Sequence, residues 1–221
     1  MLENISKELS YVRVTTLRKG DPVLVESHPS NWRCVGVGNS AAVFQLKNAP
    51  HLSIKVYADK YASIAQDEAA IYQQLGDSPF FPHFYGYGEN YICIEYRPGC
   101  NINDCLVQGI YIPEQVIYDV DEAIAYARSR NLNPTDIHSK NILVHEGRGF
   151  LIDVSDYGQT EECKRWDNLK QAYYNYYIKL YRPGFTVPSW VLEIIRKWYK
   201  ANEAKDNLED FAETIVRLFF K

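Results

Sequence analysis

The chain has 221 residues, of which 46% are hydrophobic and 24% charged, and its formal net charge is -4 at pH 7. This composition is typical of a globular protein, and it indicates neither a disordered tail nor a strongly basic nucleic-acid coat. No stretch is apolar for long enough to span a bilayer, no leader pattern opens the chain, and its five cysteines include no Cys-x-x-Cys pair. We therefore expect a cytoplasmic protein with free thiols and no membrane partner.

The first half of the chain has the residue pattern of short strands separated by turns. Runs rich in β-branched and apolar residues predict strands at 11–17, 23–26, 53–57 and 91–96, and a strand–turn–strand unit over 34–46. Residues 47–50 are a plausible hairpin loop, and apolar side chains at three- and four-residue spacing predict a helix over 61–75. Gly76-Asp77-Ser78-Pro79 should end that helix.

The second half of the chain reads as mainly helical after Arg97-Pro98-Gly99. Residues 113–130 have the period of an amphipathic helix, and residues 142–144 and 150–152 predict a short hairpin. From Trp166 to the end we predict helices broken at residues 182–184 and near Pro188. A strand-rich part joined to a helix-rich part by one turn predicts an α+β fold with two lobes.

Two polar residues flank the predicted hairpin at nearly equal distances from its turn. Asn141 precedes the first strand and Asp153 follows the second. Because paired strands lie about 5 Å apart, these two side chains should lie side by side. A carboxylate and an amide oxygen suit Mg²⁺, which takes few protein ligands. An asparagine cap and a surface aspartate are the structural alternative.

Several other residues have both a chemical and a structural interpretation. Gly36 and Gly38 lie in a strand–turn–strand unit where the backbone can approach a phosphate, although many such glycines only make turns. Lys55 lies in an otherwise apolar strand, and Glu68 on the next helix can reach back to it. Asp136 lies on a loop five residues before the asparagine of the hairpin.

Taken together, these residues resemble the signature set of the protein-kinase-like superfamily in order and context. The segments 81–88 and 92–99 are similar to the family's segment after the first helix and to its adenine-binding strand and hinge. The resemblance covers roughly Val35 to Asp167 and is closest to a small, atypical, bacterial-type serine/threonine kinase-like protein with a reduced C-lobe. It implies one kinase-like domain over 1–221, with an antiparallel β N-lobe at 1–97 and a mainly helical C-lobe at 98–221.

The resemblance also implies roles for individual residues. Gly36 and Gly38 would let backbone amides cover the phosphates of ATP, and Lys55, oriented by Glu68, would hold the α- and β-phosphates. Asp136 would accept the proton of the acceptor hydroxyl. Adenine would be bound by Val43, Ile94, the Glu95 carbonyl and the Arg97 N–H, and Mg²⁺ by Asn141 and Asp153.

The chain departs from the family pattern at several positions. Ala41 replaces the third glycine of the loop, and Pro134-Thr135 stand in place of the family's His-Arg. Val154-Ser155 replace Phe-Gly after the metal aspartate, and no Ala-Pro-Glu follows them. Loss of this peptide platform is seen in atypical and small-molecule kinases of the family.

We expect an ATP- and Mg²⁺-dependent phosphotransferase that acts on a hydroxyl group, favouring serine or threonine of a protein. A small-molecule kinase similar to aminoglycoside and choline kinases is an alternative, because a histidine follows the catalytic aspartate by two residues (His138). A pseudokinase that binds without turnover is another. Residues 164–200 are basic and rich in tyrosine, and we favour packed tyrosines there over a nucleic-acid site.

Overall fold

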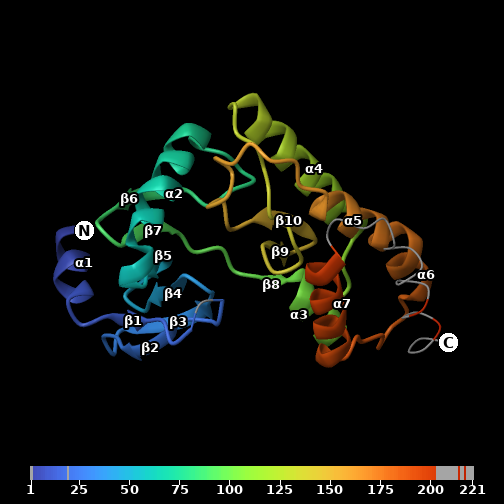
Figure 1. The fold of residues 1–221 in the computed structure, drawn as a ribbon, viewed down its shortest axis with the longest axis horizontal. Helices are drawn as coiled ribbons and strands as arrows, with labels where there is room; N and C mark the ends of the chain where they lie inside the picture. Colours follow the sequence, from blue (N-terminus) through green and yellow to red (C-terminus); the bar gives the residue numbers. More distant parts are fainter. Residues whose placement is uncertain (1, 19, 203–213, 215–216, 218–221) are drawn as a thin grey trace. The chain divides into compact units, whose positions relative to one another are not determined.

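A computed structural model describes residues 2–18, 20–202, 214 and 217 (Figure 1). The chain divides into two compact units, each built from three segments. The first unit comprises Met1–Pro98, Ala125–Pro134 and Asp153–Thr160, and the second comprises Gly99–Ile124, Thr135–Ile152 and Glu161–Lys221. The helix predicted to continue beyond residue 202 falls outside the described residues. Among those residues, no helix is long and apolar enough to cross a membrane.

The first unit is built on a five-stranded antiparallel sheet with strand order β3-β4-β5-β7-β6 (Figure 1). A separate two-stranded hairpin, β1-β2, precedes it. The elements are α1 (Leu2–Leu9), β1 (Arg13–Thr15), β2 (Leu24–Ser27), β3 (Trp32–Val37), β4 (Ala41–Leu46), β5 (Ala49–Tyr57), a 3-10 turn (Asp59–Tyr61), α2 (Ala62–Leu75), β6 (Phe84–Tyr87) and β7 (Tyr91–Glu95).

One face of this sheet carries the hydrophobic core of the unit. Side chains alternate between the two faces of a strand, so Phe44 of β4 and Ile54 and Val56 of β5 point the same way. All three are buried in one cluster with Ile5 of α1 and Val14 of β1. The N-terminal helix and hairpin therefore cover this face and leave the opposite face for α2.

The helix α2 packs on the sheet through residues that recur every three or four positions. Its buried side chains include Ala65, Glu68, Tyr72 and Leu75, and the ring of Tyr72 stacks on a phenylalanine of β6 with centroids 5.7 Å apart. The helix ends at Gly76, where φ is 66° and the N–H donates to the carbonyl of Tyr72 at 3.0 Å. That left-handed backbone favours glycine, which explains why the predicted stop signal works.

The second unit is mainly helical and contains one small antiparallel sheet with strand order β10-β9-β8. Its sheet pairs the predicted hairpin with a two-residue strand just after the first unit's Pro98. The elements are β8 (Cys100–Asn101), α3 (Ile102–Gln108), α4 (Glu114–Ser129), β9 (Ile142–His145), β10 (Arg148–Leu151), α5 (Arg165–Ala172), a π-helical segment (Tyr173–Tyr177), α6 (Ile178–Leu180) and α7 (Ser189–Asn202).

Two tyrosines of the π-helical segment are anchored on the loop before α4. The Tyr173 hydroxyl donates to the carbonyl of Ile112 at 3.1 Å, and the Ile112 N–H donates to the Tyr177 hydroxyl at 2.9 Å. Both tyrosines are buried, so their rings fill the unit while their polar ends satisfy one residue's backbone. This confirms the packing interpretation for these two residues of the tyrosine-rich segment.

A buried carboxylate joins α4 to the β9–β10 hairpin. Asp119 accepts hydrogen bonds from Nε and Nη2 of Arg148 and from the Gly149 N–H, each at 2.8 Å. Burial acts to raise the pKa of Asp119, but the hydrogen bonds from Arg148 and Gly149 outweigh it and hold the pKa below its ordinary value of 3.8. A side chain at position 149 would meet the backbone carbonyl of Val116 at 2.9 Å, so the close approach of hairpin and helix requires glycine there.

The structure confirms the predicted α+β class and most of the longer elements. The helix α1 and the short strands β6 and β8 were not predicted, and the first strand covers only Arg13–Thr15 of the predicted 11–17. The predicted loop 47–50 is wrong in part, because β5 begins at Ala49 and pairs back to β4 from its first residue. Short strands such as β8 depend on pairing with distant residues, which local propensity does not report.

We predict that Asp119→Asn destabilises the protein by about 2 kcal/mol, since it removes the charged acceptor of the hydrogen bonds from Arg148 and Gly149 and places an amide N–H donor close to these donors. The difference in unfolding free energy between the parent and Asp119→Asn should shrink as the pH falls. A carboxylate with a lowered pKa stabilises the fold in full above its unfolded-state pKa and loses this effect as the pH falls through its folded-state pKa. Urea unfolding between pH 3 and pH 7 measures both effects. Glu114→Gln, on the exposed side of the same helix, is the matched control, and an equal loss in both variants would contradict the assignment.

Candidate active site

The register of the five-stranded sheet brings several predicted ATP-binding residues into one row. Gly36 of β3 pairs with Val43 of β4, which pairs with Lys55 of β5, which pairs with Ile92 of β7. Directly paired residues of antiparallel strands point to the same face of a sheet. Val43 and Lys55 therefore lie side by side on the face that carries α2.

The two loop glycines lie where the protein itself tolerates a side chain. Gly36 and Gly38 both lack a left-handed φ, and an added Cβ would meet only ordinary contacts, at 3.9 Å from Val43 and at 3.5 Å from the Ala41 carbonyl. The Gly38 N–H donates to that carbonyl at 2.8 Å and closes the turn. Neither backbone conformation nor crowding within the chain accounts for glycine at these positions.

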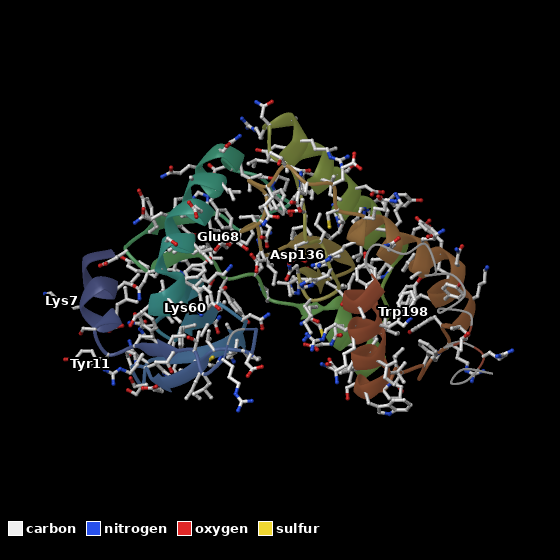
Figure 2. The ribbon with its side chains drawn as sticks, viewed as in Figure 1. Lys7, Tyr11, Lys60, Glu68, Asp136 and Trp198 are labelled. Carbon is white, nitrogen blue, oxygen red and sulfur yellow. The ribbon has the colours of Figure 1, made fainter. Side chains whose placement is uncertain are left out.

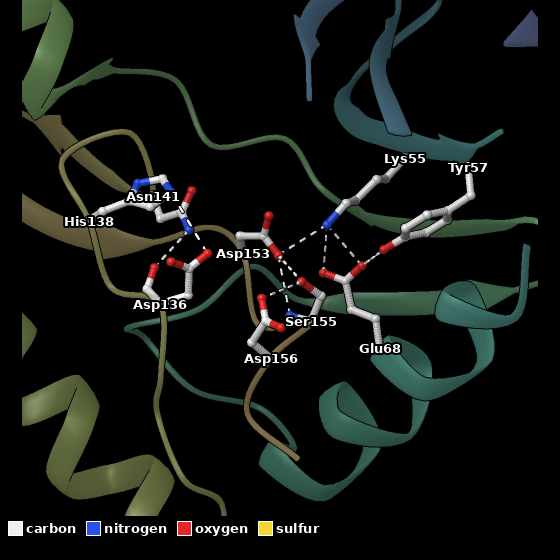
Figure 3. Close-up of polar contacts among 9 residues, drawn as sticks. All are labelled: Lys55, Tyr57, Glu68, Asp136, His138, Asn141, Asp153, Ser155 and Asp156. Atoms are coloured by element: carbon white, nitrogen blue, oxygen red, sulfur yellow. Dashed lines mark hydrogen bonds and ion pairs between the residues drawn. The ribbon is translucent and has the colours of Figure 1, made fainter. Parts of the chain in front are cut away.

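Lys55 is buried and paired with two carboxylates (Figure 3). Its Nζ lies 2.9 Å and 3.0 Å from the two oxygens of Glu68 and 3.1 Å from Oδ1 of Asp153. Glu68 is fully buried on α2, whereas Lys60 and Tyr11 of the same unit are exposed (Figure 2). The structure thus brings together three of the residues that the sequence analysis singled out, and their catalytic roles stay predictions.

Three tyrosines that the sequence analysis did not identify surround this ion pair. The Tyr57 hydroxyl donates to the Glu68 carboxylate, and its ring centroid lies 5.4 Å from the Lys55 ammonium. Tyr72 lies one helical turn after Glu68, and Tyr72 and Tyr157 are both almost completely buried. The strand period gives a signal for Tyr57, which follows Lys55 by two residues and so shares its face.

Burial and the neighbouring charges set the protonation of this cluster. Burial raises the pKa of Glu68 to about 7, against the opposing effect of the Lys55 ammonium. Burial also acts against the charge of Lys55, but Asp153 and then Glu68 outweigh it and raise the pKa of Lys55 above its ordinary value. The pKa of Asp153 is lowered despite burial, because Lys55 and the hydroxyl and N–H of Ser155 stabilise its charge.

Asp153 is held by its own turn as well as by Lys55. The Ser155 N–H and hydroxyl donate to Asp153 Oδ1 at 3.2 Å and 2.9 Å, and the lysine contacts the same oxygen. All of these contacts engage Oδ1, so they fix the orientation of the carboxylate (Figure 3). The Val154 N–H in this turn stabilises the Glu68 carboxylate, which ties the turn to α2.

The predicted adenine-binding residues lie at the end of β7. Ile94 is buried and pairs with Ser53, whose hydroxyl lies 3.3 Å from the Ile94 carbonyl and 3.4 Å from that of Glu95. Nε of Arg97 donates to the Glu95 carboxylate at 2.9 Å. These contacts order the segment, and adenine binding by it remains a prediction.

In the second unit, Asp136 and Asn141 are part of one hydrogen-bonded loop. Nδ2 of Asn141 donates to the backbone carbonyl of Asp136 at 3.1 Å, and the Asn141 N–H donates to the His138 carbonyl at 2.9 Å. Because the amide nitrogen is engaged, a ligand approaching Asn141 would meet its Oδ1. The Ile152 N–H donates to the Asn141 carbonyl at 3.1 Å, so hairpin pairing extends to this residue.

Asp136 has two cationic or titratable neighbours in its own unit. Arg165, at the start of α5, forms an ion pair with Asp136 Oδ1, and Nε2 of His138 lies 3.8 Å from Oδ2. The sequence analysis had placed Arg165 only within a basic segment. Nothing in local periodicity connects it with a loop so far away along the chain.

The two predicted metal ligands belong to different units, Asn141 to the second and Asp153 to the first. Among the residues that the structure describes, no three histidine, cysteine, aspartate or glutamate side chains gather as a metal-ligand cluster. A Mg²⁺ site needs fewer protein ligands than that, and the pair remains a prediction.

The raised pKa of Glu68 gives a prediction for the pH dependence of stability. An acid whose pKa is higher in the folded state stabilises the fold below its unfolded pKa and loses this effect as the pH rises through the folded value. From pH 4.5 to pH 7 the protein should lose about 3 kcal/mol of stability through Glu68, and Glu68→Gln should remove this slope. Urea unfolding at several pH values tests it, with the exposed Glu89→Gln as control. If the unfolding free energies of Glu68→Gln and the parent changed equally with pH, Glu68 would be ionised over this whole pH range, and the prediction would be wrong.

Proteins similar to this chain include a bacterial relative and a solved protein structure. No protein-family model matches the chain. Over 168 residues it is 40% identical to a Bacillus subtilis (strain 168) protein named "Putative serine/threonine-protein kinase YrzF", covering 75% of this chain and 78% of that protein. A crystal structure of Rad53 residues 1–466 in complex with AMP-PNP aligns with a TM-score of 0.47 and 17% identity over 62% of this chain, which spans about half (47%) of that structure. On the strength of the Bacillus relative, the chain belongs to the family of protein-kinase-like proteins.

Proposed function

We propose that the chain is an ATP- and Mg²⁺-dependent phosphotransferase, and that its two units act as one kinase-like domain over residues 1–221. The observation that carries this proposal is the buried Lys55 ammonium held between the carboxylates of Glu68 and Asp153. Burying a charge of this kind costs several kcal/mol, and a merely structural site is often as stable with apolar residues. Such a triad is therefore better explained by chemistry than by stability alone.

The triad has the charge pattern that a metal–nucleotide complex requires. One ammonium faces two carboxylates, so Lys55 can bind the phosphates while Asp153 binds a cation. Asp153 and the Oδ1 of Asn141 would hold Mg²⁺, and both are the oxygen ligands that this ion prefers. When bound, Mg²⁺ supplies neutralisation of the charge on the β- and γ-phosphates.

The strand–turn–strand unit formed by β3 and β4 supports phosphate binding. Gly36 and Gly38 leave open the space that a side chain would fill, although their own backbone does not need glycine. A ligand lying against β3 and β4 would gain direct access to backbone N–H groups. Val43, in the same row as Lys55, and Ile94 would pack on the adenine, with the Glu95 carbonyl and the Arg97 N–H as its hydrogen-bond partners.

Asp136 is the residue that we assign to proton transfer. As the acceptor oxygen forms its bond to the γ-phosphorus, the bond from that phosphorus to the bridging oxygen of ADP breaks, and the hydroxyl proton passes to Asp136. The protein's contribution is positioning and charge stabilisation, since the phosphoryl group itself carries the chemistry.

The hydroxyl of a protein serine or threonine is our first candidate for the acceptor, and the name of the Bacillus relative supports it. A small molecule is the second candidate, because residues 154–164 form no helix or strand that could serve as a peptide platform. Transfer from labelled ATP to pools of peptides and of metabolites distinguishes the two. A pseudokinase would bind ATP and label neither pool.

The contrast between Lys55 and Asp153 tests nucleotide binding. We expect ATP with Mg²⁺ to raise the melting temperature of the parent, because binding to the native state alone stabilises it. Lys55→Ala should weaken ATP binding with or without metal, and Asp153→Ala only when Mg²⁺ is present. Calorimetric titrations measure this, with the exposed Lys60→Ala as the matched control. Binding of MgATP to Asp153→Ala at parental affinity would rule out its metal role.

A second test concerns Asp136. Asp136→Asn keeps the size and most hydrogen bonding of the side chain but removes the proton acceptor. It should leave ATP affinity nearly unchanged and lower phosphoryl transfer by roughly 10²-fold or more. Single-turnover transfer and ATP titration are compared in the same preparation. Loss of binding with unchanged turnover of the bound ATP would show that Asp136 has a different role.

A further inference from the structure

We propose that Arg165 is a positioning residue for the transfer reaction, which fixes the carboxylate of Asp136 so that its Oδ2 oxygen meets the acceptor hydroxyl. This inference rests on the proposed function. It concerns only the second unit, in which every residue of the argument lies.

The carboxylate of Asp136 is engaged at one oxygen. Oδ1 is buried from solvent and accepts no hydrogen bond from the described residues, so its ion pair with Arg165 is what compensates its charge. The side chains of both residues remain about 30% exposed, at 28% for Arg165 and 32% for Asp136. Part of the carboxylate therefore stays accessible while its buried oxygen is held.

The other oxygen faces a histidine whose Nδ1 accepts a hydrogen bond from the loop. The Lys140 N–H donates to Nδ1 of His138 at 3.2 Å, so a neutral ring carries its proton on Nε2. Nε2 lies 3.8 Å from Asp136 Oδ2, which is longer than a hydrogen bond. Oδ2 is thus the oxygen of this carboxylate at which an acceptor proton can arrive.

The backbone of Asp136 requires external support. Its φ is 54°, in the left-handed region that residues other than glycine rarely adopt. Such conformations are unfavourable and persist where surrounding contacts over-determine them. Nδ2 of Asn141 holds the carbonyl of Asp136, and Arg165 holds its side chain, so the residue is fixed at both ends.

Arg165 is itself placed by two contacts that attach α5 to α4. Its neighbour Trp166 is buried and donates from Nε1 to Asp121 Oδ1 at 2.8 Å. One turn later, Lys170 forms an ion pair with the other oxygen of Asp121. The two oxygens of Asp121 therefore hold α5, one through Trp166 and the other through Lys170. This attachment places Arg165 beside the loop that carries Asp136.

This arrangement predicts a kinetic signature that differs from loss of folding. A displacement of about 1 Å in a catalytic group can cost 10²-fold in rate. Arg165→Gln should lower kcat for transfer by roughly 10- to 100-fold and leave the KM for ATP within about twofold of the parent. Arg165→Lys should recover part of the rate, because a lysine keeps the charge without the planar guanidinium.

The experiment compares these variants with Arg196→Gln, which removes an arginine paired with Glu193 on the surface of α7. Added guanidinium ion should restore part of the transfer by Arg165→Ala and none by Asp136→Asn or Arg196→Gln. A parental rate in Arg165→Gln would overturn the inference, and so would a faster rate, which would make Arg165 an inhibitory contact.

A second measurement does not depend on activity. Labelling of carboxylates with a carbodiimide and an amine, followed by peptide mass spectrometry, should modify Asp136 several-fold faster in Arg165→Gln than in the parent. Arg196→Gln should not change that rate. If the parent transfers no phosphoryl group, the proposed function fails, and equal labelling of Asp136 in the parent and in Arg165→Gln would separately disprove the ion pair.

Discussion

The first unit is organised around one buried ammonium, that of Lys55, which is shared by Glu68 and Asp153. The charge tolerates burial only because three separate segments converge on it: the strand β5, the helix α2 and the turn after β10. Removing the ammonium would leave two carboxylates close together without a counter-charge, which costs more than the ion pairs contribute. Tyr57 and the Val154 N–H further stabilise Glu68. The position of α2 and the conformation of the turn are therefore linked through one side chain.

The strand β5 serves both the core and the candidate site because of its period of two. Ile54 and Val56 belong to the core cluster on one face, whereas Lys55 and Tyr57 belong to the other. The apolar face is completed by α1 and the β1–β2 hairpin, which supply Ile5 and other buried residues. With its core closed on that side, the sheet can carry charged groups on the side that faces α2.

Much of the fold and of the candidate site could be predicted from the sequence, and the features that could not be predicted share a physical cause. The period of α2, its glycine stop and the strand that carries Lys55 follow from local rules, since strand alternation and helix spacing are encoded by near neighbours. Asp119 and Arg165 could not be found in this way, because each acts on a partner far away along the chain. Tyr57 lies between these cases: its face was predictable, but its bond to Glu68 depends on where α2 packs.

The charges of the two units differ in a way that bears on the ligand. In the second unit, Arg165 balances Asp136 one to one, whereas in the first unit Lys55 faces two carboxylates. Burial raises the pKa of Glu68 to about 7, which favours its neutral form below that pH and so lessens the imbalance. A bound cation would pair with Asp153. Lys55 would then pair with a bound anion and with an ionised Glu68. A metal–nucleotide complex supplies both charges at once, whereas a bare anion or a bare cation would satisfy only one side of the triad.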